Sequence, residues 1–451
     1  MGAKNDQHGS FMNKISVDTA INARWIVPVV PRQRVLENCA LLIREGRILD
    51  IVPQSGIGEK YAIGETFNLP HHALIPGLIN CHGHAAMSLL RGYADDKPLK
   101  VWLEQHIWPT EARWVSEEFV SVGSELAIAE MLLSGTTCFS DMYFFPEVCA
   151  RAAQKSGIRA QLVFPILDFP TAWASGPDEY LDKGLKLHDQ YRDSDLIRIG
   201  FGPHAPYTVS DGPLQRVATL SEELQAPVQI HLHETAQEVQ DALKNSGRRP
   251  SQRLFELGLM SPLTQCVHVT QVDSQDVDIF ENSGAHLIHC PDSNMKLASG
   301  TCPVNRFLQA GINVALGTDG AASNNDLDMF SEMQHAALLA KLDSGDASAL
   351  DSATALEMAT INGAKALGID DCTGSLEKGK YADICAVDMS QLRFQPLYQL
   401  VSQLVYTNVG DALRYVWVAG RLLVKDRELQ TLSSDNIAEA ARVWQEKIQG
   451  E

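Results

Sequence analysis

The chain has 451 residues, of which 45% are hydrophobic and 21% are charged, and its formal net charge is −19. This average composition excludes a disordered, collagen-like or disulfide-scaffold protein. No apolar run approaches the roughly 18 to 20 residues of a membrane span. Because no basic cluster offsets the acidic charge, neither nucleic acid nor a membrane is expected as a partner, and solubility explains the charge.

Nine cysteines are scattered along the chain without a CxxC pair. Most lie in apolar, strand-like contexts, which predicts free thiols in a reducing compartment. Residues 1–12 are polar and glycine-rich and lack the basic-then-apolar layout of a signal peptide, so a cytoplasmic location is expected. Whether this segment is native is left open.

Eight short apolar runs alternate with longer helical patterns between residues 73 and 340. The helical segments place apolar residues three and four apart and begin with Ser, Asp or Pro. Eight strand-then-helix units predict an α/β fold, a (β/α)8 TIM-like barrel. An open doubly wound sheet is the alternative, but no glycine-rich dinucleotide turn accompanies the strands. The predicted strands are Leu74–Cys81, Thr136–Met142, Ala160–Leu167, Ile197–Gly202, Val228–His231, Gln265–Val269, Ala285–His289 and Asn313–Gly317.

Both ends of the chain contain short alternating runs, broken by Arg-Glu-Gly at 44–46 and by Ala-Gly at 419–420. Such patterns are typical of β-hairpins. Strands on both sides of a barrel predict one small β-sandwich formed from both chain termini. The tail strands are expected at Asp383–Val387, Leu404–Tyr406, Tyr415–Val418 and Arg421–Val424, and a bridging helix at Ala353–Leu367.

The expected domain plan follows from these patterns. It assigns residues 14–70 and 373–435 to the sandwich, 71–372 to the metal-dependent barrel, and 436–451 to a C-terminal helix.

His82 and His84 end the first predicted barrel strand, with Gly83 between them. Residues two apart on a strand project to the same face, so both imidazoles can reach one metal ion. An HxH pair alone is weak evidence, but active sites of barrels lie at the carboxyl ends of the strands.

Histidines also stand at the ends of other predicted strands: seven of the 14 histidines fall at or beside a predicted strand end. Histidines scattered through a core would not cluster in this way, so a metal site is predicted. Histidine nitrogens with a carboxylate suit a divalent ion such as zinc, with Fe(II) as the alternative. Water on such an ion has a pKa of about 7, which predicts hydrolytic chemistry. The further candidates are His204, His231, His233, Glu234, His268, His289 and Asp319.

Competing catalytic motifs are incomplete. Residues 233–237 begin like HExxH but carry Gln in place of the second histidine. No PCxxC follows an HxE, and no GxSxG occurs. Residues 374–380 approach a phosphate-binding loop, but Tyr381 replaces the Ser or Thr that would hold Mg²⁺.

The sequence resembles the amidohydrolase superfamily over nearly its whole length. Residues 76–84 are similar to its metal-strand signature, and residues 374–384 to its return into a β-sandwich. Five separated strings in order narrow the resemblance to the 5-methylthioadenosine/S-adenosylhomocysteine deaminases. These strings are Leu90–Asp96 with Trp102–Glu104, Gly202–Tyr207, His231–Thr235, Ser293–Gly300 and Gly317–Asn325.

The resemblance implies one divalent metal ion per subunit, held by His82, His84, His231 and Asp319, with Zn²⁺ expected and Fe²⁺ as the alternative. It selects His231 over His233, a choice that spacing left open. The implied reaction is hydrolytic deamination of 5′-methylthioadenosine, adenosine or S-adenosylhomocysteine to the inosine analogue and ammonia, by attack of metal-bound hydroxide at C6.

The resemblance also assigns roles to the residues around the metal. Glu234 protonates the purine ring, Asp319 passes a proton to the leaving ammonia, and His268 orients the attacking oxygen. Glu104 accepts hydrogen bonds from the ribose hydroxyls, and His204 donates to the substrate.

The stretch 162–170 contains no arginine that could meet a homocysteine carboxylate. Phe164, Phe169 and Trp173 suit a methylthio tail, with ordinary packing as the other interpretation. Methylthioadenosine or adenosine is therefore preferred over S-adenosylhomocysteine.

Two other functions stay open. The barrel could act on another heteroaromatic, such as guanine or an s-triazine, or it could be a non-catalytic structural relative. Glu104 and His204, which suit a ribose, argue against the first, and the complete set of metal ligands argues against the second. The expected partner is a small purine nucleoside, and a homo-oligomer is an open expectation.

Overall fold

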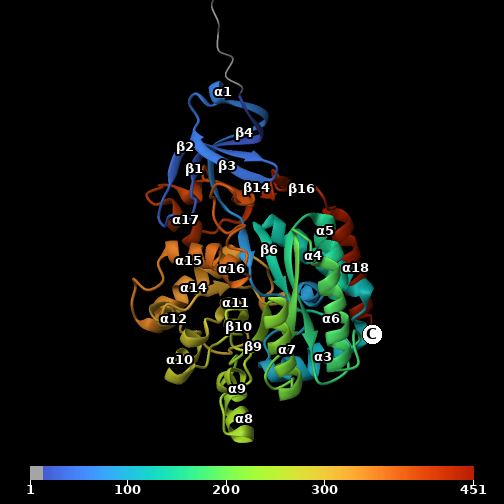
Figure 1. Ribbon diagram of the computed structural model, residues 1–451. Helices are drawn as coiled ribbons and strands as arrows, with labels where there is room; N and C mark the ends of the chain where they lie inside the picture. Colours follow the sequence, from blue (N-terminus) through green and yellow to red (C-terminus); the bar gives the residue numbers. More distant parts are fainter. Residues whose placement is uncertain (1–13, 451) are drawn as a thin grey trace, which may run out of the picture.

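The computed structural model describes residues 14–450, which form a barrel and a sheet built from both ends of the chain (Figure 1). The polar segment 1–12 lies outside the described residues. Within residues 14–450, no helix is both long and apolar enough to cross a membrane.

Eight parallel strands form the barrel and follow one another around it in chain order. The first and last strands meet where the Cys81 amide donates a hydrogen bond to the Leu316 carbonyl at 2.9 Å. The predicted (β/α)8 barrel is thus confirmed. Its strands are β5 (Leu78–Asn80), β6 (Thr136–Asp141), β7 (Arg159–Ile166), β8 (Ile197–Pro203), β9 (Val228–Leu232), β10 (Thr264–His268), β11 (His286–His289) and β12 (Val314–Leu316).

Helices surround the barrel, and local sequence explains where they begin and end. Ser116 caps the helix that follows it by accepting a hydrogen bond from the Phe119 amide. Gly157 ends the next helix in the left-handed conformation. The helices are α4 (Glu117–Leu133), α5 (Pro146–Ser156), α6 (Pro177–Tyr191), α7 (Asp211–Leu224), α8 (Ala236–Ser246), α9 (Pro250–Glu256), α10 (Ser274–Ser283), α11 (Pro291–Lys296), α12 (Val304–Gln309), α13 (Ala321–Asn324) and α14 (Met329–Ser344).

Between β5 and α4 the chain forms a series of short helices that line one side of the cavity described below. They are η1 (Ala85–Leu90), α2 (Leu99–Trp102), η2 (Leu103–Ile107) and α3 (Trp108–Trp114).

The second sheet, in the upper part of Figure 1, combines strands from both ends of the chain. Its order is β16-β15-β14-β13-β4-β1-β2-β3, with β1 and β4 parallel and the other neighbours antiparallel. Ile21 and Leu41 share a core with Ile384 and Trp417, so strands from both termini complete it. The strands are β1 (Ile15–Ile26), β2 (Leu36–Arg44), β3 (Arg47–Pro53), β4 (Tyr61–Pro76), β13 (Ile384–Asp388), β14 (Leu413–Val418), β15 (Arg421–Lys425) and β16 (Glu428–Leu429), and α1 (Ile57–Lys60) precedes β4.

The predicted strand Leu74–Cys81 is divided at Gly77. Residues before it end β4 in the second sheet, and residues after it form β5 of the barrel. A Cβ atom on Gly77 would lie 2.1 Å from Thr137 Oγ1, so only glycine allows the chain to pass this close to β6.

One prediction near the C-terminus is wrong, and another is refined. Leu404–Tyr406 belongs to the helix α17 (Leu400–Tyr406), because an apolar run of three residues does not distinguish a strand from a buried helix. The helical stretch expected at Ala353–Leu367 is confirmed as two helices, α15 (Ser352–Met358) and α16 (Ile361–Ala366). Thr360 between them has non-helical φ and ψ of −133° and −96°.

The chain ends in α18 (Ser434–Gln449), which packs along α4 (Figure 1). The Trp444 ring meets the Phe119 ring edge-on, with centroids 5.3 Å apart. The division of the chain into residues 14–70, 71–372, 373–435 and 436–451 stays a prediction.

Candidate metal centre and active site

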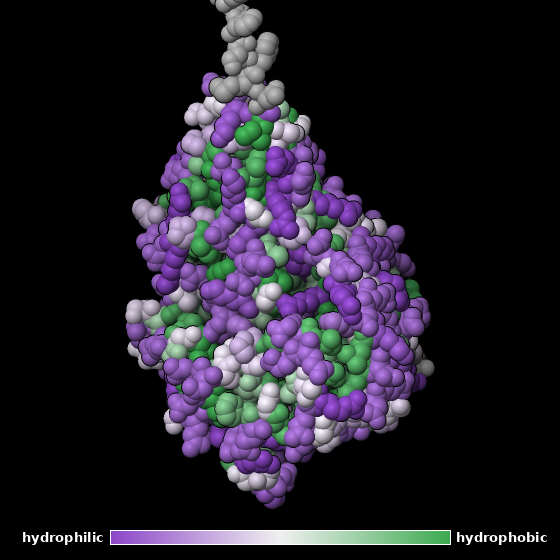
Figure 2. Space-filling model, viewed as in Figure 1, coloured by the Kyte–Doolittle hydropathy of each residue, from purple (hydrophilic) through white to green (hydrophobic). Residues whose placement is uncertain are grey.

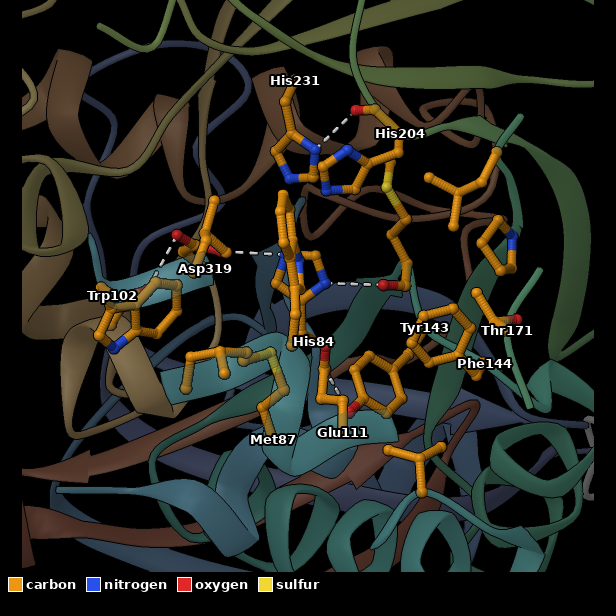
Figure 3. A pocket seen from close by; sticks show the side chains of 18 of the residues that line it. His84, Met87, Trp102, Glu111, Tyr143, Phe144, Thr171, His204, His231 and Asp319 are labelled. Carbon is orange, nitrogen blue, oxygen red and sulfur yellow. Dashed lines mark hydrogen bonds and ion pairs between the residues drawn. The ribbon is translucent and has the colours of Figure 1, made fainter. Parts of the chain in front are cut away.

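A cavity of about 290 Å³ lies at the carboxyl ends of the barrel strands. In Figure 3 the labelled side chains of His84, His204, His231 and Asp319 turn toward one another in its wall. The cavity thus lies where the positions of the predicted residues indicated. The predicted site residues that line it are His84, His204, His231, Glu234, His268 and Asp319.

The four predicted ligands form a close cluster, and all of them except His82 line the cavity. Asp319 Oδ1 lies 3.4 Å from His82 Nε2 and 3.3 Å from His84 Nε2. His231 Nε2 lies 3.2 Å from His82 Nε2. His82 is fully buried, and His231 and Asp319 are 7% and 6% exposed. The ends of β5, β9 and β12 bring these distant residues together.

Each of the three imidazoles uses its other nitrogen to hydrogen-bond an acceptor. Nδ1 of His84 and of His231 each donates to a backbone carbonyl at 2.7 Å. Nδ1 of His82 donates to Gln229 Oε1 at 2.8 Å. These acceptors require the proton on Nδ1 and leave the lone pair on Nε2, as metal-binding histidines need.

The cluster fits a divalent metal ion. Two unprotonated ring nitrogens 3.2 Å apart repel each other unless a cation lies between them. Asp319 Oδ2 accepts hydrogen bonds from Ser293 Oγ at 2.6 Å and Ser323 Oγ at 3.0 Å, which leaves Oδ1 beside the imidazoles. Three imidazole nitrogens and one carboxylate oxygen form a donor set of the zinc type.

Two other histidines near strand ends do not line the cavity. His233 Nε2 accepts a hydrogen bond from the Ser251 amide at 3.1 Å, and Nδ1 lies 3.8 Å from Asp276 Oδ2. His289 is buried, and burial lowers its pKa to about 3. Both therefore have environments typical of structural histidines.

Glu234 and His268 lie beside the cluster, with Glu234 Oε2 3.8 Å from His268 Nε2. Burial raises the pKa of Glu234 to about 8, and the charge of Asp319 adds to the shift. At neutral pH Glu234 is protonated and can donate a proton. Nδ1 of His268 hydrogen-bonds Asn294 Oδ1 at 2.9 Å, which holds this ring in place.

His204 follows β8 and forms another part of the wall. Its Nδ1 lies 3.1 Å from Thr208 Oγ1. Burial lowers the pKa of His204 to about 3, so the ring is neutral at physiological pH. A neutral imidazole in the wall can hydrogen-bond a polar ligand without adding charge.

Glu104 is not among the residues that line the cavity. Its side chain on η2 is 49% exposed and lies 4.0 Å from Lys100 Nζ. Glu111 on α3 lines the cavity instead, and its Oε1 accepts a hydrogen bond from the Tyr143 hydroxyl at 2.6 Å (Figure 3). Burial raises the pKa of Glu111 to about 7. Glu111 is not among the residues predicted from the sequence. Its position two helical turns after Glu104 would place it on the same helix face, as a candidate for the same ribose-binding role.

The remaining wall is mostly apolar. Phe169 lines it, whereas Phe164 packs on Phe201 with ring centroids 5.1 Å apart, and Trp173 donates from Nε1 to Glu147 at 3.3 Å. No Lys or Arg of the described chain lines the cavity. Apolar lining residues include Met87, Leu99, Trp102, Leu103, Ile107, Trp108, Val115 and Phe144.

The profile of the amidohydrolase family matches residues 73–423 of the chain. A 5-methylthioadenosine/S-adenosylhomocysteine deaminase of Teredinibacter turnerae is 59% identical over 436 residues, which cover 97% of this chain and 99% of the relative. The chain belongs to the amidohydrolase family, in the branch of these deaminases. The resemblance seen in the sequence is thereby confirmed.

Solved structures agree with this membership. The crystal structure of an adenosine deaminase from Xanthomonas campestris with bound zinc has a TM-score of 0.96 and 46% identity, and covers 97% of this amidohydrolase and 100% of its own chain. An atrazine chlorohydrolase from Arthrobacter aurescens, 21% identical, has a TM-score of 0.89 over 94% of this chain and 99% of its own, and shares the fold.

The two histidines of the His-Leu-His sequence differ in what their removal should do. We expect His231→Ala to lose most of its metal, because one of the converging Nε2 donors disappears. His233→Ala, the matched control, should keep its metal and unfold at a lower temperature, since the Ser251 amide loses its acceptor. Metal analysis by mass spectrometry and thermal unfolding distinguish the two. Equal metal loss in both variants would contradict this assignment.

Proposed function

We propose that this amidohydrolase deaminates a 6-aminopurine nucleoside, preferably 5′-methylthioadenosine or adenosine, to the inosine analogue and ammonia. One observation carries the proposal: the cluster that fits a metal shares a cavity with Glu234, a buried carboxyl group whose pKa burial raises to about 8. The name of the Teredinibacter turnerae relative supports the same substrates.

We assign one Zn²⁺ per subunit to His82, His84, His231 and Asp319. Nitrogen-rich donor sets of this kind favour zinc, with Fe²⁺ as the alternative. The bound zinc named for the Xanthomonas campestris deaminase supports the choice. A divalent ion held there supplies a water of lowered pKa as the attacking group.

The side chains around it divide the proton transfers. As water oxygen bonds to C6, Glu234 donates its proton to N1, so that charge does not build up on the ring. Asp319 takes one proton from the attacking water and passes it to the amino group, and the C6–N bond breaks to release ammonia. The second proton of the water leaves the oxygen on C6 as the C6=O bond forms and returns to Glu234. His268 Nε2 hydrogen-bonds the attacking oxygen and orients it. One water is consumed for each ammonia released.

Glu111 is the better carboxylate for the ribose hydroxyls than Glu104. It lines the cavity, and the Tyr143 hydroxyl occupies one oxygen and leaves the other available as an acceptor. Glu104 is half exposed beside Lys100. His204 stays in its assigned role as a neutral hydrogen-bond partner of the substrate.

The apolar wall favours an uncharged 5′ substituent. Among the described residues of the cavity wall, no Lys or Arg could pair with the carboxylate of a homocysteine group. An unpaired charge in such a site is costly, whereas a methylthio group gains from apolar contact. We therefore rank S-adenosylhomocysteine below methylthioadenosine.

The other hypotheses have less support. A guanine deaminase or s-triazine hydrolase acts on a ligand that has no ribose. Such a ligand offers no hydroxyl groups for Glu111 to bind. A non-catalytic relative is disfavoured by the complete donor set and by Glu234. The cytoplasmic location and a homo-oligomeric state stay predictions.

Ammonia release tests the function directly. With zinc loaded, we expect turnover of methylthioadenosine and adenosine, weaker turnover of S-adenosylhomocysteine, and none of guanine. A buried charge without a partner costs about 1–3 kcal/mol. The kcat/KM for S-adenosylhomocysteine should therefore be roughly 5- to 150-fold lower than that for methylthioadenosine. The proposal fails if the metal-loaded enzyme releases no ammonia from any of these nucleosides.

Replacement of the proton donor should separate chemistry from metal binding. Glu234→Gln keeps the shape of the side chain but cannot donate a carboxyl proton, so kcat should fall about 10²- to 10⁴-fold. The metal content should stay at the wild-type level, which serves as the internal control. A variant with near wild-type turnover would show that Glu234 is not the acid.

The two helical carboxylates provide a matched pair. Glu111→Gln should raise the KM for the nucleoside about 10- to 100-fold, as expected for loss of a charged hydrogen-bond acceptor. Glu104→Gln should change it by less than about twofold, as expected at an exposed ion pair. The reverse order of effects would restore Glu104 to the ribose site.

The pH dependence gives a second check on Glu111. Because its pKa is raised to about 7, the ionised acceptor is present above pH 7 and is lost as the pH falls through 7. The wild-type KM should therefore rise toward acid pH, and this part of the rise should be absent in Glu111→Gln.

A further inference from the structure

Three glutamines lie inside the barrel, below the metal cluster. Gln161 on β7, Gln229 on β9 and Gln265 on β10 are at most 2% exposed. Gln229 and Gln265 are paired in register on neighbouring strands, and Gln161 is paired with Ser140 on β6. Branched apolar side chains usually fill this space in such barrels, so three buried amides need a specific explanation.

The amides bond to one another across the interior. Gln265 Oε1 accepts from Gln229 Nε2 at 2.7 Å and from Gln161 Nε2 at 2.8 Å. Gln265 Nε2 donates to the Ala366 carbonyl at 2.8 Å, which ties the group to α16. No amide atom of the three lacks a partner among the described residues.

These bonds determine which way Gln229 faces. Its Nε2 donates to the Cys81 carbonyl at 2.8 Å as well as to Gln265, so Oε1 must be the atom that faces His82 Nδ1 at 2.8 Å. A carbonyl oxygen can only accept. His82 must therefore carry its proton on Nδ1 and keep the Nε2 lone pair free.

We propose that Gln229 is a positioning residue, which sets the tautomer and ring orientation of His82 for metal binding and is itself oriented by the Cys81 carbonyl and Gln265. His82 has most need of such a partner, because its Nε2 lies close to both Asp319 and His231. His84 and His231 are oriented by backbone carbonyls instead. The inference rests on the metal site of the proposed function.

Substitutions that keep size test this role. Gln229→Met removes both functions of the amide, and Gln161→Met is the matched control, since it removes a buried amide of the same network that does not touch His82. Gln229→Glu keeps an acceptor for His82 and, as a buried protonated carboxyl group, a donor for the Cys81 carbonyl. The measurements are the zinc dissociation constant of metal-free enzyme by competition with a chelating dye, the absorption spectrum of the Co²⁺-loaded enzyme, and the unfolding temperature without metal.

We expect Gln229→Met to weaken zinc binding about 10- to 100-fold and to change the Co²⁺ spectrum, as loss of an orienting partner does. Gln161→Met should lose stability but keep its zinc affinity within about threefold, and Gln229→Glu should also stay within about threefold of the wild type.

Each variant is decisive by itself. Equal zinc affinity in the two Met variants would overturn the inference, and so would a tenfold loss in Gln229→Glu. If Gln229→Met does not fold, the Glu variant still provides the test. Failure of the wild-type chain to bind zinc would overturn the metal site itself, which is a different result.

Discussion

The hydrogen bonds between the first and last barrel strands are the constraint on which the site depends. The Cys81 amide bonds the Leu316 carbonyl at 2.9 Å, and the Asp319 amide bonds the His82 carbonyl at 3.0 Å. A Cβ atom on Gly317 would lie 2.8 Å from the His82 amide nitrogen, so glycine permits this approach. Closure thus brings a histidine from one end of the barrel sequence to an aspartate from the other.

The closed barrel also places two carboxyl groups of opposite protonation in one cavity. Asp319 Oδ2 accepts hydrogen bonds from Ser293 Oγ at 2.6 Å and Ser323 Oγ at 3.0 Å, which stabilise the ionised carboxylate. Glu234 accepts one hydrogen bond of this kind, from Ser299 Oγ at 3.2 Å, and burial still raises its pKa to about 8. At neutral pH one group is a base and the other an acid, which is the division of roles that hydrolytic deamination needs.

Much of this could be predicted from the sequence, because the relevant signals are local. Strand periodicity located the barrel, and the positions of His82, His231 and Asp319 at strand ends indicated a metal site. Glu104 and Glu111 show the limit. They lie seven residues apart on the adjoining helices η2 and α3, and only the packed structure turns Glu111 toward the cavity.

The sequence by itself determined the fold class, the strand ends and the types of side chain available for chemistry, since these depend on short-range patterns of apolar and polar residues. Only the tertiary structure decided which residues distant in the sequence come into contact. It gives His233 the Ser251 amide as its partner, replaces Glu104 by Glu111 in the cavity, and joins Gln229 to His82. Such contacts depend on strand register and barrel closure, which no local pattern encodes.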